Sequence, residues 1–294
     1  MRQPARLGSS VFSVADIYPK IAALRTRIAV GEPLYFVKVD ATDCFNSIPQ
    51  PAMTSLLHSL LASEQYSVAF WSEFTTANRC HYNRIGNVVG GFEDFATSLR
   101  VGTRPRRGGK HAVLIDSVTQ SRRYRSTIVA LFEEHVTNNI VKIGRQHYRQ
   151  RQGIPQGSVL STLLCSFFYG EFERTHLSFL RDGDHGNKSV LVRLVDDFLL
   201  VTSERDVARR FLDVMLAGSP EFGVRVRADK TLCNFEASFH GRAVRRLSRQ
   251  QAWFPYCGLT VNTQTLDVRK TPAGLGPEGA VAVCSCPGGA ATRD

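Results

Sequence analysis

Residues 191–203 read LVRLVDDFLLVTS, and this stretch decides the fold. Apolar residues flank the adjacent Asp196 and Asp197 on both sides, and Arg193 is the only other charge near them. The pattern predicts two apolar strands over residues 189–203, joined as a β-hairpin with the carboxylates at its bend. An Asp pair most often simply occupies a tight turn, so the pair by itself leaves open whether it binds a ligand.

Strands and helices alternate on either side of this hairpin. The β-branched and aromatic run LYFVKVD (34–40) predicts a buried strand that ends in Asp40. The turn-forming stretch QGIPQGS (152–158) leads into a long apolar helix that we expect to end near residue 173. Further helices are expected over 13–29, 51–64 and 204–217, a helix followed by a strand over 126–150, and strands over 224–235 and 254–269. This order favours an α+β domain with an antiparallel sheet and helices on one face.

The chain is basic. Its 294 residues carry a net charge of +11, which favours a polyanionic partner such as nucleic acid or an anionic membrane surface. Basic residues gather at 104–110, 122–125 and 242–249; any one group could be a solvated face, and three together favour nucleic acid. The seven cysteines form no CxxC pair or zinc spacing, and no apolar run is long enough to span a membrane. We therefore expect reduced thiols in a soluble, intracellular protein.

Asp40, Asp196 and Asp197 all stand at the ends of expected strands. Carboxylates that converge beside a core repel one another unless cations neutralise them, and oxygen ligands suit Mg²⁺ or Mn²⁺. Two such ions about 4 Å apart support in-line phosphoryl transfer, as in polymerases and nucleases. The 152–158 turn would let backbone approach a ligand, although an ordinary loop-to-helix junction is an equal alternative. It does not match a Walker A loop.

Five stretches, in the expected order, resemble motifs of the telomerase reverse transcriptase family. They are LYFVKVDATDCFNSIPQ (motif A), QGIPQGSVLSTLLCSFFYGEFE (motif B′), LVRLVDDFLLVT (motif C), ADKTLCNF (motif D) and FPYCGLTVNTQTLDV (motif E). The resemblance covers roughly residues 11–270 and is weak between 65 and 125, where the family carries an insertion within its fingers. It implies a polymerase palm with that insertion.

The resemblance also implies a metal site. Asp40, Asp196 and Asp197 would bind two Mg²⁺ ions in an RNA-directed DNA polymerase, with Asp40 and Asp196 bridging both ions. Lys230 matches the motif D lysine that would protonate pyrophosphate; a surface lysine at a strand start is the alternative. Arg193 and Lys38 could hold the carboxylates or contact nucleic acid.

Substrate contacts follow from the same motifs. The expected nucleotide-binding residues are Ala41, Phe45, Gln156 and Gly157, with Phe45 excluding a ribonucleotide 2′-hydroxyl; a core aromatic is its alternative role. The expected primer-binding residues are Tyr256, Cys257 and Gly258. Two positions depart from the pattern, since Asp43 stands where many telomerases have a small residue and Tyr256 where Trp is frequent.

The resemblance implies partners and a location as well. We expect a telomerase RNA template, a telomeric single-stranded DNA primer and dNTPs, no membrane, and a place in the nucleus at the telomeric region of chromosomes. The expected segments are an N-terminal helical lead-in, the motif A region, the insertion in the fingers, the remaining palm motifs and a disordered tail (1–33, 34–64, 65–135, 136–270 and 271–294).

Fingers motifs 1 and 2, expected before residue 11, and the thumb and RNA-binding domain are not recognised, so we expect a palm truncated at both ends. A catalytically incompetent nucleic-acid-binding fragment and a retroelement reverse transcriptase are the two alternatives.

Overall fold

The computed structural model describes residues 4–75, 80–87, 112–181, 188–248 and 250–271. The chain forms two compact units, residues 54–140 and the remainder, which are described separately below. Basic group 104–110 and the expected disordered tail beyond residue 271 lie outside the described residues. No described helix is long and apolar enough to cross a membrane.

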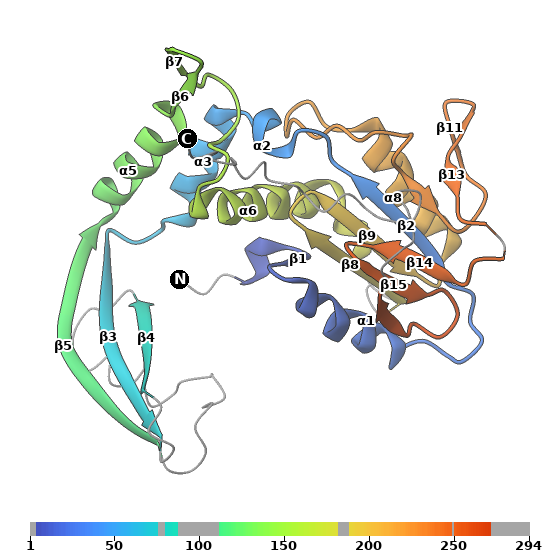
Figure 1. Cartoon of the computed structure of the whole chain (residues 1–294), viewed down its shortest axis with the longest axis horizontal. Helices are drawn as coiled ribbons and strands as arrows, with labels where there is room; N and C mark the ends of the chain where they lie inside the picture. Colours follow the sequence, from blue (N-terminus) through green and yellow to red (C-terminus); the bar gives the residue numbers. More distant parts are fainter. Residues whose placement is uncertain (1–3, 76–79, 88–111, 182–187, 249, 272–294) are drawn as a thin grey trace, which may run out of the picture. The chain divides into compact units, whose positions relative to one another are not determined.

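The larger unit is built on a sheet of strand order β1-β8-β9-β2-β10-β13. Its four central strands, β8 (Ser189–Leu194), β9 (Asp197–Thr202), β2 (Tyr35–Asp40) and β10 (Leu232–Cys233), pair antiparallel. The edge strands β1 (Ser10–Val11) and β13 (Arg245–Arg246) pair parallel to their neighbours. The hairpin expected over 189–203 is therefore confirmed, and β2 lies directly beside it (Figure 1).

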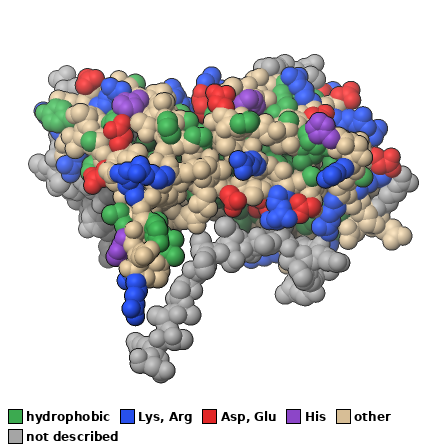
Figure 2. All heavy atoms as spheres, turned by 90° about the horizontal axis from the view of Figure 1, so that it is seen from above, with side chains coloured by type: hydrophobic (Ala, Val, Ile, Leu, Met, Phe, Trp, Pro, Cys, Tyr) green, Lys and Arg blue, Asp and Glu red, His purple; other side chains and the backbone are tan. Residues whose placement is uncertain are grey.

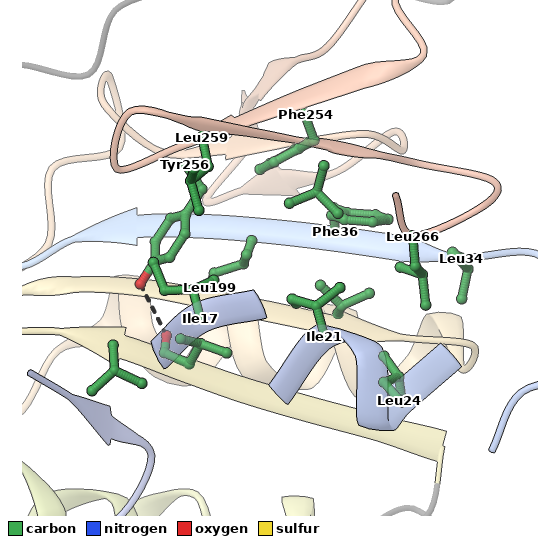
Figure 3. Close-up of a cluster of buried hydrophobic side chains, with 14 of the residues drawn as sticks. Ile17, Ile21, Leu24, Leu34, Phe36, Leu199, Phe254, Tyr256, Leu259 and Leu266 are labelled. Atoms are coloured by element: carbon green, nitrogen blue, oxygen red, sulfur yellow. Dashed lines mark hydrogen bonds between the residues drawn. The ribbon is translucent and has the colours of Figure 1, made fainter. Parts of the chain in front are cut away.

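One face of this sheet is closed by α1 and a small three-stranded sheet. Helix α1 (Ile17–Arg25) begins after a one-turn helix, η2 (Val14–Asp16), where the Ser13 amide N–H and Oγ donate to Asp16 Oδ2 at 3.0 and 2.8 Å. The small sheet comprises β14 (Trp253–Tyr256), β15 (Leu259–Asn262) and β16 (Val268–Lys270). Their buried side chains meet Phe36 and Leu199 in one apolar cluster (Figure 3).

Helices α6 (Val159–His176) and α8 (Arg205–Ala217) pack on the other face. Phe198 points to that side and lies 5.8 Å from the Tyr169 ring of α6. None of the α8 side chains joins the cluster around α1. The α+β palm is thus confirmed: α6 and α8 share one face of the sheet, and the short α1 lies on the other.

Shorter elements connect these layers. They are η1 (Pro4–Leu7), α2 (Cys44–Ser47), η3 (Ser178–Leu180), β11 (Ser238–Phe239) and β12 (Arg242–Ala243). The continuous strand predicted over 224–235 is wrong. Only Val224, Val226 and β10 pair there, because the amide N–H of Thr231 donates to the Arg227 carbonyl (3.1 Å) and turns the chain between Val226 and β10.

The smaller unit contains a three-stranded antiparallel sheet of order β4-β3-β5. Its strands are β3 (Gln65–Thr75), β4 (Cys80–Asn87) and β5 (Ala112–Tyr124), and the register of β3 and β5 shifts between Ala69 and Trp71. Helix α3 (Gln50–Leu60) leads into this unit, and α5 (Arg125–Thr137) follows β5. Beyond α5 the chain forms the hairpin of β6 (Ile140–Ile143) and β7 (Gln146–Arg149).

Candidate active site

The two carboxylate-bearing strands meet at their ends. In the β2–β9 pair, Asp40 lies directly opposite Asp197. The amide N–H of Ala41 donates to the Asp196 carbonyl at 3.1 Å, which fixes the end of β2 against the hairpin turn. Directly opposed residues of antiparallel strands point to the same face, so the two side chains are neighbours. The sequence placed the three aspartates at strand ends, and the structure brings those ends together.

The protein's own groups do not fully offset the negative charge of these carboxylates, as the pKa values of Asp196 and Asp197 show. Burial and the neighbouring Asp197 charge raise the pKa of Asp196 to about 6, and Asp40 adds to this. Burial also raises the pKa of Asp197, although Lys38 opposes the rise. One Asp197 oxygen, Oδ1, is buried and accepts no hydrogen bond from the described residues. The site therefore favours a cation.

Lys230 forms an ion pair with Asp40. Its Nζ lies 3.3 Å from Asp40 Oδ2, and the side chain is half exposed. The preceding backbone is tied to the end of β2, because the Thr42 amide N–H donates to the Arg225 carbonyl at 2.7 Å and Ala41 forms a bridge with Val226. Lys230 is thus held beside the carboxylates and within reach of solvent, while its role as a proton donor stays a prediction.

Arg193 holds the turn that carries Asp196. This side chain is fully buried and pairs with Glu173 of α6, with Nε 2.7 Å from Oε1. Its Nη1 donates to the Val195 carbonyl at 3.3 Å, and Nη2 donates to the carbonyls of Leu7 and Ser166 at 3.1 and 3.0 Å. Of the two roles considered for Arg193, the structure favours holding the carboxylates, since a buried guanidinium cannot reach nucleic acid.

Glu173 is the residue that the sequence did not single out. It accepts from the Ser9 amide N–H at 2.6 Å and from Ser9 Oγ at 2.8 Å, in addition to Arg193. These hydrogen bonds replace the water that burial removes from the Glu173 carboxylate, and a buried charge requires such partners. An acidic residue inside the apolar run SFFYGEFE was the available signal.

The 152–158 loop is docked against α2. The amide N–H of Ile154 donates to the Phe45 carbonyl at 2.7 Å, and Gln156 Nε2 donates to Asn46 Oδ1 at 3.1 Å. Gly153 has φ +77, and a Cβ there would lie 2.4 Å from the Phe45 carbonyl oxygen, so only glycine allows this approach. The loop therefore places Gln156 next to α2, which carries the half-buried Phe45.

The remaining expected nucleotide contacts differ in accessibility. Gly157, with φ +80, is exposed and has open space where a Cβ would stand. Ala41 is only 1% exposed, and its N–H is already bonded to Asp196. Ala41 could therefore offer a nucleotide little beyond its carbonyl, whereas Gly157 offers open backbone.

The expected primer contacts lie against Asp197. Tyr256 is fully buried, and its hydroxyl donates to the Asp197 carbonyl at 2.9 Å; its other contact is the Val192 carbonyl at 3.3 Å (Figure 3). Cys257 and Gly258 form the β14–β15 turn with φ 46 and 75. Cys257 Sγ donates to Asp197 Oδ2 at 3.5 Å, and burial raises the pKa of this thiol. Tyr256 thus holds the turn, and only Cys257 and Gly258 can be reached from outside.

No three or more His, Cys, Asp and Glu side chains among the described residues are grouped so as to hold a metal ion by themselves. Mg²⁺ does not need such a cage, because it is usually bound through one or two carboxylates together with waters and substrate phosphates. The unpartnered Asp197 oxygen and the raised pKa values of Asp196 and Asp197 fit a site completed by a cation.

A family model described as reverse transcriptase (RNA-dependent DNA polymerase) matches residues 111–261. The chain belongs to the reverse transcriptase family. The curated proteins that it matches include several telomerase reverse transcriptases, which confirms the resemblance seen in the five motifs. It is 37% identical to the telomerase reverse transcriptase of Bos taurus over 279 residues and 33% identical to that of Oryzias latipes over 283 residues. Each alignment covers 91% of this chain and 24% or 25% of the relative, so the chain spans about a quarter of their length.

Solved telomerase structures share this fold. Apo telomerase from Candida tropicalis, truncated from its C-terminal domain, superposes with a TM-score of 0.58 over 90% of this chain and 41% of that protein, at 20% identity. Telomerase from Candida albicans in complex with a fragment of telomeric RNA gives 0.59 over 94% and 36%, at 21% identity.

Proposed function

We propose that this chain forms the catalytic palm of a telomerase-type RNA-directed DNA polymerase, which adds telomeric repeats to chromosome 3′ ends by two-metal nucleotidyl transfer. The observation that carries the proposal is the register of β2 and β9, in which Asp40 lies opposite Asp197 with Asp196 in the adjoining turn. Clustered carboxylates with raised pKa values are typical of a catalytic cation site.

Asp40, Asp196 and Asp197 would hold two Mg²⁺ ions. When bound, the ions would activate the primer 3′-hydroxyl and stabilise the departing pyrophosphate. The protein's own share is to keep the three carboxylates together: Ala41 fixes the strand end, and Arg193 and Glu173 fix the turn.

Other residues would bind and orient the substrates. Lys230, half exposed beside Asp40, would donate a proton to pyrophosphate. Phe45 would exclude a 2′-hydroxyl, and Gln156 and Gly157, docked beside it, would contact the incoming nucleotide and its template base.

Beside Asp197, the Cys257–Gly258 turn would position the primer end, and Tyr256 would hold that turn in place. The primer contact would thus lie against a catalytic carboxylate.

The partners would be a telomerase RNA template, a telomeric single-stranded DNA primer and dNTPs, in the nucleus at chromosome ends. The net charge of +11 supports polyanionic partners. Figure 2 shows Lys and Arg side chains interspersed with Asp and Glu. A related telomerase of known structure is in complex with a fragment of telomeric RNA, which supports an RNA partner.

The test uses Asp40→Asn and Asp196→Asn, with the exposed Asp213→Asn of α8 as the matched control. Mn²⁺ binding to the chain is followed by electron paramagnetic resonance, and primer extension is followed on an RNA template with dNTPs and Mg²⁺. We expect both site variants to weaken Mn²⁺ binding at least about tenfold and to abolish extension, whereas Asp213→Asn behaves as wild type.

Undiminished Mn²⁺ binding by Asp196→Asn would refute the metal site. Metal binding without extension would instead favour the incompetent nucleic-acid-binding fragment, and extension on any RNA template without a dedicated telomerase RNA would favour a retroelement enzyme.

A further inference from the structure

The β6–β7 hairpin carries a concentration of positive charge that the proposed active site does not use. Residues 141–151 read VKIGRQHYRQR and contain Lys142, Arg145, Arg149 and Arg151, with no acidic residue. Every residue of both strands is exposed. The hairpin therefore has no buried face of its own, and a two-stranded ribbon of this kind is marginally stable unless something covers it.

The two faces of the hairpin differ in character. A two-residue turn, Gly144–Arg145, places Ile143 opposite Gln146. The Tyr148 hydroxyl donates to Gln146 Oε1, so these two side chains share one face with Ile143. Alternation then places Lys142 on the opposite face, together with His147 and Arg149. One face is uncharged, and the other face and the tip are basic.

The hairpin leads directly into the 152–158 loop. Gln50 Nε2 donates to the carbonyls of Gln150 and Gly153 at 3.4 and 3.0 Å, and Gln150 Nε2 donates to the Ile154 carbonyl at 3.3 Å. The base of the hairpin is therefore tied to the loop that carries Gln156 and Gly157. The expected primer contacts lie on a different element, the β14–β15 turn against Asp197.

We propose that the basic face and tip of the β6–β7 hairpin bind the phosphates of single-stranded RNA, as the template strand enters the site. The choice of the template strand as the ligand rests on the proposed function, in which Gln156 and Gly157 contact the incoming nucleotide and its template base. The charge of the segment favours a polyanion as its partner, because residues 141–151 contain four cations and no acidic residue. Lys142 and Arg145 are the residues that contact phosphates.

The test measures binding to an RNA–DNA hybrid with a single-stranded RNA overhang, over a range of salt concentrations and without dNTPs or metal. The variant Lys142→Gln/Arg145→Gln is compared with Arg209→Gln, an exposed arginine of α8, and with Ile143→Thr, which keeps a β-branched residue on the opposite face. Removing one cation that binds a phosphate should reduce the slope of log affinity against log salt by about 0.7. The double variant removes two such cations, so we expect its slope to fall by about 1.4, and the slopes of Arg209→Gln and Ile143→Thr to stay unchanged.

A second hybrid, in which the DNA primer strand and not the RNA strand carries the overhang, separates binding of the template from binding of the primer. We expect the double variant to bind it as the wild type does. An unchanged salt slope on the RNA overhang would overturn the proposal and make the hairpin a protein-docking element. Equal losses on both overhangs would overturn the template assignment. Because the assay needs no catalysis, an inactive chain with the expected slopes would refute the proposed function and leave the hairpin surface standing.

Discussion

Two hairpins of this chain share a two-residue turn and differ in everything that surrounds it. The first turn residue has nearly the same backbone conformation in both, with φ 59 at Val195 of the β8–β9 hairpin and φ 63 at Gly144 of the β6–β7 hairpin. Glycine adopts this conformation freely, whereas a β-branched residue is strained there. The β8–β9 turn nevertheless keeps valine, because the buried Arg193 holds the Val195 carbonyl. The β8–β9 turn, which positions Asp196 and Asp197, thus combines a strained residue with a buried charge. The β6–β7 turn, whose cations are exposed to solvent, has an unstrained glycine instead.

Removing the buried support should have the largest effect. Arg193→Ala removes the cation that is hydrogen-bonded to the buried Glu173 and leaves only the longer Arg181 pair (3.9 Å), which should lower the free energy of unfolding by about 3–5 kcal/mol. Urea unfolding followed by circular dichroism measures this. Arg145→Ala at the tip of the β6–β7 hairpin is the control and should change stability by less than about 0.5 kcal/mol.

The double variant Arg193→Met/Glu173→Leu tests whether the loss of stability in Arg193→Ala comes from the buried charge of Glu173. Replacing a buried ion pair by apolar residues is often nearly neutral, so this variant should recover most of the stability and yet extend primers poorly, because the turn is no longer held. Full activity in the double variant would contradict the positioning role of Arg193.

Placing a valine at the first turn residue of the β6–β7 hairpin, as in the β8–β9 hairpin, should have the next largest effect on stability. No atom lies within 4 Å of the position that a Cβ at Gly144 would occupy, so Gly144→Val introduces backbone strain without a clash. We expect a loss of about 1–3 kcal/mol of stability or local melting of β6 and β7, seen by amide hydrogen exchange. Gly144→Asn should cost less, because Asn tolerates this conformation. Equal costs for Val and Asn would show that the turn is not what limits the hairpin.

Asp196 should make the first hairpin sensitive to pH. Its pKa is raised from 3.8 to about 6, so between these values the folded chain retains a proton that the unfolded chain has released. Stability therefore falls as pH rises through this window. In the presence of a chelator, Asp196→Asn should be more stable than wild type by about 3 kcal/mol at pH 7 and equally stable below about pH 3. Thermal unfolding at both pH values checks this; a constant difference would refute the raised pKa.

The smallest effect is expected on the uncharged face of the β6–β7 hairpin. Ile143 is 65% exposed, so Ile143→Thr removes almost no buried contact and should change the free energy of unfolding by less than about 0.5 kcal/mol. A loss above about 1 kcal/mol in urea unfolding would mean that this face is covered in solution, and the contrast between the two hairpins would then fail.

The sequence predicted the parts of this site that depend on local pattern. The strands around Asp196 and Asp197 and the strand ending in Asp40 were expected because apolar side chains at strand spacing are a local signal. The five motifs then indicated that these strands meet, although the exact register of Asp40 and Asp197 follows only from the paired backbones.

The errors and omissions have physical causes too. Glu173 was missed because its partners, Ser9 and Arg193, are distant in sequence, and nothing local shows that its charge is buried. The strand over 224–235 was expected from alternation in VRVR, but hydrogen bonding at Thr231 turns the chain first. No elements were assigned between 75 and 125, where β4 and β5 form, because polar residues and glycines mask strand periodicity.

The apolar cluster around α1 also orders events during synthesis. Ile17, Ile21 and Leu24 are synthesised before part of their cover, since Phe254 and Leu266 follow more than two hundred residues later. Contacts so distant in sequence form slowly, since a long loop must close first. Until then α1 exposes its apolar side to chaperones and to other nascent chains. A stalled chain that ends before residue 254 would contain all three aspartates and still have the apolar side of α1 exposed.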